Sequence, residues 1–149
     1  MGNAIQGTHY LPVRLGTQFD KTNTTLATIT GFSFDGLAGR TYKIKAKMRW
    51  TAHGTGGIKF AINGSATFTD IRCSITFFAD SSLAPVKQDQ LVTKGTAVSH
   101  AGTTAGFVLV HGAVVVDAAG TVTLDMAEFS ATGTASILTG AIFEYKLCQ

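Results

Sequence analysis

Apolar and polar residues alternate with a period of two along most of this chain, and the helical spacing of apolar residues is almost absent. Such alternation sends successive side chains to opposite faces of a β-strand. It is unbroken in residues 41–51 (TYKIKAKMRWT) and recurs in segments 58–62, 71–77, 122–127 and 142–147. Short strands at close intervals predict an all-β, antiparallel sandwich or barrel.

The same alternation predicts which side chains lie in the core. We expect the following residues to be largely buried: Tyr42, Ile44, Met48, Trp50, Ile58, Phe60, Ile62, Val122, Leu124, Met126, Phe143 and Tyr145. Residues 25–34 form a further expected strand, broken at Gly31. The segment 106–116 (GFVLVHGAVVV) is apolar on both faces, which favours a central strand that is buried on both sides.

Turn-forming residues separate these segments. Asn63-Gly64 is the strongest short signal for a β-hairpin. Residues 53–59 (HGTGGIK) indicate a flexible connection between two strands, and 117–120 and 130–134 indicate turns. Residues 78–90 (FADSSLAPVKQDQ) are expected to form a loop, because Pro85 cannot serve a central strand.

The chain of 149 residues has the size of one domain. Residues 1–13 lack periodicity and are expected to form an N-terminal arm, followed by a single domain over residues 14–149. The start has neither the charged nor the apolar region of a signal peptide, and no apolar run is long enough to span a membrane. Two cysteines, Cys73 and Cys148, make no disulfide framework, so we expect reduced thiols and synthesis in a cytoplasm.

The low charge of the chain bears on its surface. Apolar residues make up 45% of the sequence and charged residues 14%, with a formal net charge of +3. This composition excludes a disordered tail and is only mildly basic for a dedicated nucleic-acid binder. A surface of small, weakly polar and apolar groups more often faces other protein than open water. An ordinary low-charge soluble domain remains the alternative.

No catalytic or metal-binding motif is present. The histidines His9, His53, His100 and His111 lack the short, fixed spacing of metal ligands. The carboxylates fall mostly at turns or at outward strand positions, and although a glycosidase pair can be far apart in sequence, nothing favours one. We therefore expect a protein that is not an enzyme and uses no metal or cofactor. His111, inside an apolar strand, is expected to be a hydrogen-bonded core or interface residue.

One segment concentrates positive charge. Four cations, Lys43, Lys45, Lys47 and Arg49, occupy every second position of residues 41–51 and must share one face of the strand. That face could bind a polyanion, or it could contact water or another protein. A nucleic-acid-binding sheet places stacking aromatics on the same face as its cations, whereas here the aromatics lie on the opposite face. We therefore interpret the four cations as a candidate protein-contact face rather than a DNA-binding one.

The chain resembles a known group of proteins. The segments TNTTLATITGFSF, AGRTYKIKAKMRWTAHGTGGIKFAING and VVVDAAGTVTLDMAEFSATGTASILTGAIFEYKL are similar to the jelly-roll domain of many tailed-phage structural proteins. That domain in turn resembles the tumour necrosis factor-like jelly roll. The resemblance covers residues 22–147 and implies an eight-stranded antiparallel jelly roll.

The resemblance also implies a role. In tailed phages such domains serve as capsid decoration (cement) proteins, head fibres, or tail and baseplate modules, often as trimers. We expect a decoration protein on the capsid exterior that binds the major capsid protein and itself as a homotrimer, with neither nucleic acid nor membrane as a partner. His111 and Ile142 are the candidate subunit-interface residues, and a receptor- or carbohydrate-binding tail module is the alternative.

Overall fold

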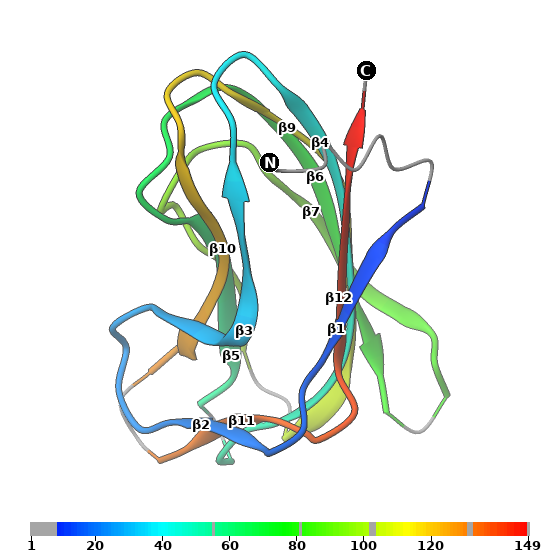
Figure 1. Cartoon of the computed structure of the whole chain (residues 1–149). Helices are drawn as coiled ribbons and strands as arrows, with labels where there is room; N and C mark the ends of the chain where they lie inside the picture. The colour runs from blue at the N-terminus through cyan, green and yellow to red at the C-terminus, as the bar shows by residue number, and fades with distance from the viewer. Residues whose placement is uncertain (1–8, 55, 81, 102–103, 131–132, 149) are drawn as a thin grey trace.

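Two antiparallel sheets packed face to face make up the molecule (Figure 1). In the computed structural model, which describes residues 9–54, 56–80, 82–101, 104–130 and 133–148, twelve strands and no helix are found. The small sheet contains, in spatial order, β3 (Ala27–Gly36), β10 (Gly120–Glu128), β5 (Ile58–Asn63) and β8 (Val98–His100).

The large sheet forms the second layer, on the right in Figure 1. Its spatial order is β1 (Leu11–Arg14), β12 (Ile142–Cys148), β4 (Thr41–Thr51), β9 (Ala105–Val116), β6 (Phe68–Ala79) and β7 (Pro85–Leu91). The short strand β11 (Ala135–Ile137) pairs with the end of β4 and with β2 (Phe19–Lys21).

Eight of the strands pair in a nested order along the chain. In the large sheet β1 pairs with β12 and β4 with β9, while in the small sheet β3 pairs with β10 and β5 with β8. Successive nested pairs therefore alternate between the two sheets, which is the winding of a jelly roll. The predicted fold class is confirmed. The hairpin β6–β7 is an insertion between β5 and β8 that widens the large sheet.

The core lies between the sheets and matches the sequence prediction closely. Eleven of the twelve expected core residues are buried, and Tyr145 is half-buried and packed against them. Aromatic rings join the two layers: Phe34 of β3 stacks on Tyr145 of β12 at a centroid distance of 4.3 Å, and Phe32 stacks on Phe143 at 5.4 Å. Strand alternation thus identifies the inward face of each layer.

The expectation that the segment 106–116 is buried on both faces is wrong. Strand β9 is central, between β4 and β6, but only the face that carries Val108, Val110 and Val114 is buried. The opposite face is half-exposed at Phe107 and Leu109, because no layer covers the large sheet on that side among the described residues.

Two turn predictions also fail. Asn63-Gly64 does not close a hairpin, since β5 belongs to the small sheet and the next strand, β6, to the large one. Gly64 has a φ of +114°, so the turn does need glycine, but it carries the chain between layers. Of the loop expected at residues 78–90, residues 85–90 belong to β7, where Pro85 is the first residue of an edge strand and no ladder bond is lost.

The expected arm contributes to the sheet. Leu11–Arg14 pairs with β12, and Val13 packs against the core. The connection expected at 53–59 joins β4 to β5, although its last two residues already belong to β5, and the turn at 117–120 joins β9 to β10. Residues 1–8 of the expected arm, residue 55 of the connection and residues 131–132 of the turn expected at 130–134 lie outside the described residues.

Candidate functional site

The face of the large sheet that points away from the small sheet is called here the outer face. The odd-numbered positions of β4 lie on it, because the even-numbered ones are core. Lys43, Lys47 and Arg49 are exposed and Lys45 is half-buried. The four cations therefore point outward, as the alternation predicts.

The other two predicted contact residues lie on the same face. Cross-strand register pairs Lys45 with His111 of β9 and Lys47 with Ile142 of β12. The alternative that His111 is a core residue is wrong, since its side chain is exposed. What the sequence offered as two candidate surfaces, a protein-contact face and a subunit interface, is one continuous surface in the structure.

Positive charge is concentrated on the outer face. Arg49 is paired with Asp80 at 2.8 Å and Arg72 of β6 with Asp70 at 2.5 Å, so these two cations are locally neutralised. Among the described residues no ion pair is formed by the remaining cations on the rows of β1, β12 and β4, which are Arg14, Lys43, Lys45, Lys47 and Lys146.

Only one carboxylate lies on those described rows, Glu144, opposite Lys45. Five cations against one carboxylate leave an excess of four positive charges, which exceeds the formal net charge of +3 for the entire chain. The outer face therefore carries the whole net positive charge of the molecule, and the rest of its surface is close to neutral.

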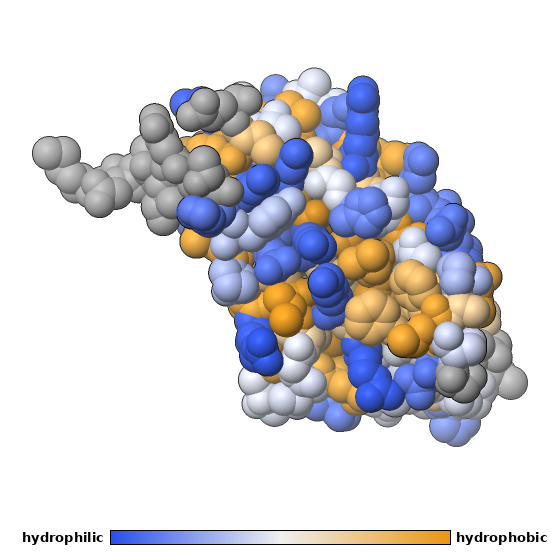
Figure 2. All heavy atoms as spheres, turned by 90° about the vertical axis from the view of Figure 1, so that its right-hand side faces the viewer, coloured by the Kyte–Doolittle hydropathy of each residue, from blue (hydrophilic) through white to orange (hydrophobic). Residues whose placement is uncertain are grey.

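The other part of the outer face is apolar. Phe107 and Leu109 of β9 lie beside Phe78 of β6, and all three side chains are half-buried. Ile142 of β12, also half-buried, lies on the same row as Leu109, with Lys47 of β4 between them. The Phe78 and Phe107 rings are 5.9 Å apart and tilted against each other. Figure 2, which looks onto this side of the molecule, shows a group of hydrophobic residues right of the centre, with hydrophilic residues around it and further hydrophobic residues among these. These four residues are called here the apolar half of the outer face.

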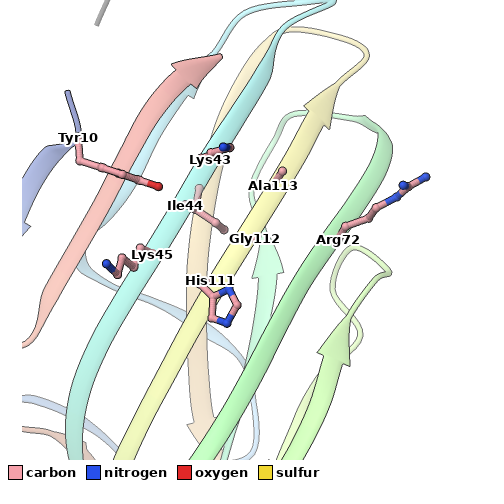
Figure 3. A pocket seen from close by; sticks show the side chains of 8 residues that line it. All are labelled: Tyr10, Lys43, Ile44, Lys45, Arg72, His111, Gly112 and Ala113. Carbon is pink, nitrogen blue, oxygen red and sulfur yellow. The ribbon is translucent and has the colours of Figure 1, made fainter. Parts of the chain in front are cut away.

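A hollow of about 480 Å³ lies in the basic half of the same face (Figure 3). Its floor is the stretch Gly112–Ala113 of β9, where large side chains are missing. Its walls are polar or cationic and come from three strands and from the residue before β1: Tyr10, Lys43, Lys45, Arg72 and His111. Figure 3 shows Ala113 between Lys43 and Arg72, with His111 farther along β9.

Sequence reasoning missed two side chains that line this hollow, Tyr10 and Arg72. Tyr10 precedes β1 in the expected arm, and the Lys146 ammonium lies 4.8 Å from the centre of its ring, a cation–π contact. Arg72 lies on β6, which is two strands from β4. Alternation places Arg72 outward, and residues 1–13 have no periodicity from which to place Tyr10; strand order and register bring both residues beside Lys43 and Lys45.

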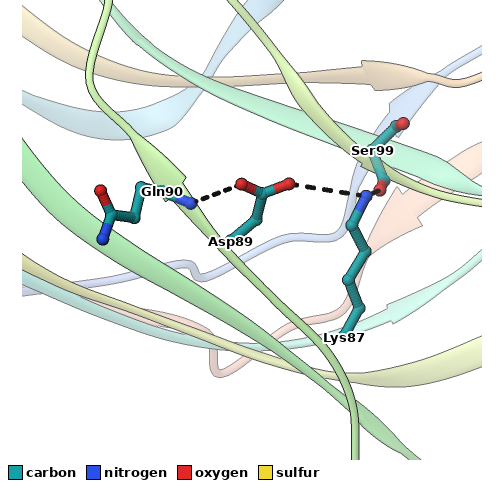
Figure 4. A network of polar contacts seen from close by, with 4 residues as sticks. All are labelled: Lys87, Asp89, Gln90 and Ser99. Carbon is teal, nitrogen blue, oxygen red and sulfur yellow. Dashed lines mark hydrogen bonds and ion pairs between the residues drawn. The ribbon is translucent and has the colours of Figure 1, made fainter.

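A second polar cluster lies at the edge of the sandwich (Figure 4). The Lys87 ammonium donates to the Ser99 carbonyl oxygen at 2.5 Å and lies 3.8 Å from the Asp89 carboxylate, which accepts a hydrogen bond from the Gln90 N–H. These contacts join β7 of the large sheet to β8 of the small sheet. The cluster closes the sandwich edge and has no arrangement of nucleophile and base.

Two titratable groups in or beside the core, the buried Cys73 and the half-buried His100, have shifted pKa values. Burial raises the pKa of the Cys73 thiol to about 12, so the thiolate nucleophile is not formed near neutral pH. Burial, with a smaller contribution from the Lys87 charge, lowers the pKa of His100. Within the described residues no cluster of three or more His, Cys, Asp or Glu side chains could hold a metal ion. In the same residues, no helix is long and apolar enough to cross a membrane.

Comparison with known proteins gives only distant structural likeness. No protein-family model and no curated protein matches the chain. Among solved structures it is similar to the infectious bursal disease virus VP2 subviral particle, with 11% identity, a TM-score of 0.24, and coverage of 92% of this chain and 39% of that one. T=1 particles derived from infectious bursal virus align at 10% identity and a TM-score of 0.26, covering 92% and 38%. The chain thus spans about two fifths of the chains it matches, and likeness at this level carries no argument about function.

Proposed function

We propose that this chain is a non-enzymatic structural protein of a tailed-phage particle, and specifically a decoration protein that binds the outside of the capsid as a homotrimer. The jelly-roll winding and the segments that resemble phage jelly rolls support the class of protein. The observation that carries the proposal is the outer face. It is a broad, uncovered sheet surface among the described residues, and it combines an apolar half with a basic half.

The apolar half favours self-association. Phe107 and Leu109 of the central strand β9 keep part of their side chains exposed, and burying them against a partner would remove that apolar area from water. The basic half favours a partner of opposite charge, since electrostatic complementarity guides assembly and fixes orientation. A shell-bound oligomer uses both contacts at once.

A tail or baseplate module that binds a receptor or carbohydrate is the second candidate. Phe129, which follows β10, is 43% exposed and lies at the start of the 130–134 turn. Exposed aromatic rings near loops are a common means of contacting sugars. This single side chain is the observation that keeps the alternative open.

The copy number in purified particles distinguishes the two. The decoration role predicts an abundance comparable to that of the shell protein, measured by gel densitometry against the major capsid band. A tail or baseplate role predicts a few copies per particle. Absence of the protein from purified particles would reject both roles, and an image of the intact particle would locate the protein directly.

A further inference from the structure

The hollow in the basic half is built on fixed backbone. A Cβ atom at Gly112 would lie 2.1 Å from the Arg72 carbonyl oxygen and 2.6 Å from the Cys73 Cα, so only glycine lets β6 approach β9 this closely. The next residue, Ala113, adds only a methyl group to the outer face. The depression is therefore a property of the paired strands and does not depend on the position of one mobile side chain.

Cross-strand register places a cation on each side of this floor. One row reads Lys43 on β4, Ala113 on β9 and Arg72 on β6. Neighbouring strands lie about 4.8 Å apart, so the backbone positions of Lys43 and Arg72 are about 10 Å apart, with the Ala113 methyl group between them. Lys45 and His111 form the next row, about 7 Å along the strands. A small anionic group above Ala113 is within reach of several donors.

Among the described residues, the lining contains hydrogen-bond donors and no carboxylate. Lys43 and Lys45 make no ion pair among the described residues, and the Tyr10 side chain extends toward β4 across β12 in Figure 3. Arg72 is held by Asp70 but is 82% exposed, and a guanidinium has enough N–H groups to serve a second acceptor. Charge excess and missing acceptors both point to an anionic ligand.

We propose that this hollow receives a carboxylate side chain from an acidic segment of the partner protein and is the docking point of the basic half. The inference rests on the proposed function and deepens it, because it names the surface that docks and the chemistry that the partner must present. A carboxylate accepts hydrogen bonds from both Lys43 and Lys45, and such charge-assisted bonds are about twice as strong as neutral ones.

Protein is favoured over nucleic acid as the source of the anion. A duplex offers evenly spaced phosphates and is bound by continuous rows of free cations. Here Arg49 is already paired with Asp80, and Glu144 lies among the lysines. Lys146 covers one face of the Tyr10 ring, and no other Phe, Tyr or Trp lines the hollow among the described residues, so the basic half offers little surface on which bases could stack.

Binding of synthetic peptides to the full-length protein tests the inference. A Glu-rich peptide and the same peptide with Gln in place of Glu serve as probes, with duplex DNA and inorganic phosphate as competing ligands. We expect saturable binding of the Glu-rich peptide only, weakened by added salt. Lys43→Gln/Lys45→Gln should weaken it about tenfold or more, because two charge-assisted contacts are lost.

A neutral variant separates the hollow from a general charge effect. Ala113→Leu fills the floor without changing any charge and should weaken the peptide about tenfold as well. Ala113→Val repeats the test with a smaller, strand-favouring side chain, and circular dichroism checks that both variants are folded. Lys21→Gln/Lys59→Gln is the matched control, since it removes two charges from other elements and should bind like wild type.

Each outcome decides the matter. Wild-type affinity in folded Ala113→Leu and Ala113→Val would show that charge alone, and not the hollow, binds the peptide, and preference for DNA or phosphate would overturn the choice of ligand. Failure of all peptide binding, in a protein that is abundant on particles, would reject this inference while the decoration role stands. Peptide binding by a protein that is absent from particles would reject the decoration role instead.

Discussion

At the scale of single residues, the partly buried His100 has a ring nitrogen without a hydrogen-bond partner among the described residues. Its ring stacks on Phe77 at 5.2 Å and meets the edge of Trp50 at 6.1 Å, and its Nε2 is buried without a hydrogen-bond partner. Burial, and then the nearby Lys87 charge, lower its pKa below the ordinary value. The neutral imidazole is therefore the form that the folded protein accommodates.

This environment predicts a loss of stability in mild acid. The unfolded chain takes up a proton at His100 near its ordinary pKa of about 6.5, whereas the folded chain resists it until lower pH. The contribution is thus fully present above that pH and is lost as pH falls through the folded-state pKa. Urea unfolding between pH 8 and pH 5 should show a decline that His100→Gln reduces. His111→Gln is the control, since that side chain is exposed, and an unchanged decline in His100→Gln would contradict the prediction.

The conformation of Gly64 affects how the chain passes from one sheet to the other. Its φ is +114°, and a Cβ atom there would lie 2.1 Å from the Thr121 carbonyl oxygen. The clash involves backbone of β10, which cannot turn away as a side chain can. The glycine therefore allows the turn after β5 to pass close to the small sheet on its way to the large one.

Replacing this glycine should be far more damaging than replacing one in open space. We expect Gly64→Ala to lower the free energy of unfolding by about 2–4 kcal/mol, because strain and a backbone clash add. Gly39→Ala is the matched control: its φ is +71° but nothing lies within 4 Å of the added Cβ, so a loss of about 1–2 kcal/mol from conformation alone is expected. The midpoints of denaturant unfolding measure both. Equal losses of unfolding free energy in Gly64→Ala and Gly39→Ala would contradict the prediction, because they would show that the contact with Thr121 adds no destabilisation.

At the scale of elements, alternation predicts the faces of strands but not their neighbours. Residues 41–51 were placed correctly, core side and outer side alike, because a period of two depends on the strand alone. The error at 106–116 arose because an apolar second face has two explanations, a second covering layer or an interface, and the sequence of one strand does not distinguish them. The half-exposed Phe107 and Leu109 now favour the interface.

Connections between elements were harder to predict for the same reason. A hairpin and a crossing between sheets both need a tight turn, so Asn63-Gly64 identifies the turn but not its destination. The candidate site shows the largest gap. Lys43 and Lys45 were identified, yet Arg72 and Tyr10 join them only through strand order, which depends on contacts among residues distant in sequence.

At the scale of the whole molecule, the outer face constrains how copies can associate. A two-fold contact through this face would bring the same surface of two subunits together. The unpaired lysines of the two subunits would then face each other and repel. A ring in which the apolar half meets a different surface of the next subunit avoids that repulsion. Because the surface outside this face is close to neutral, it is electrostatically suited to be the second surface. Charge placement thus favours the proposed trimer over a two-fold dimer.

The trimer can be tested by weakening the apolar half without altering charge. Leu109→Gln keeps a similar volume but makes the half-buried position on β9 polar, so the trimer should dissociate at a concentration about tenfold higher or more, given the value of burying a leucine side chain. Sedimentation should find the wild type at micromolar concentration with the mass of three 15.6 kDa chains, and Leu109→Gln shifted toward the single chain. Leu37→Gln, at a position 57% exposed in the turn between β3 and β4, should sediment like wild type.

Thermal unfolding of the dissociated Leu109→Gln chain should be little changed, because the core side of β9 is untouched. If the wild type sediments as a single chain, the proposed trimer is wrong. If the wild type is a trimer and Leu109→Gln does not weaken it, the subunit interface lies outside the apolar half.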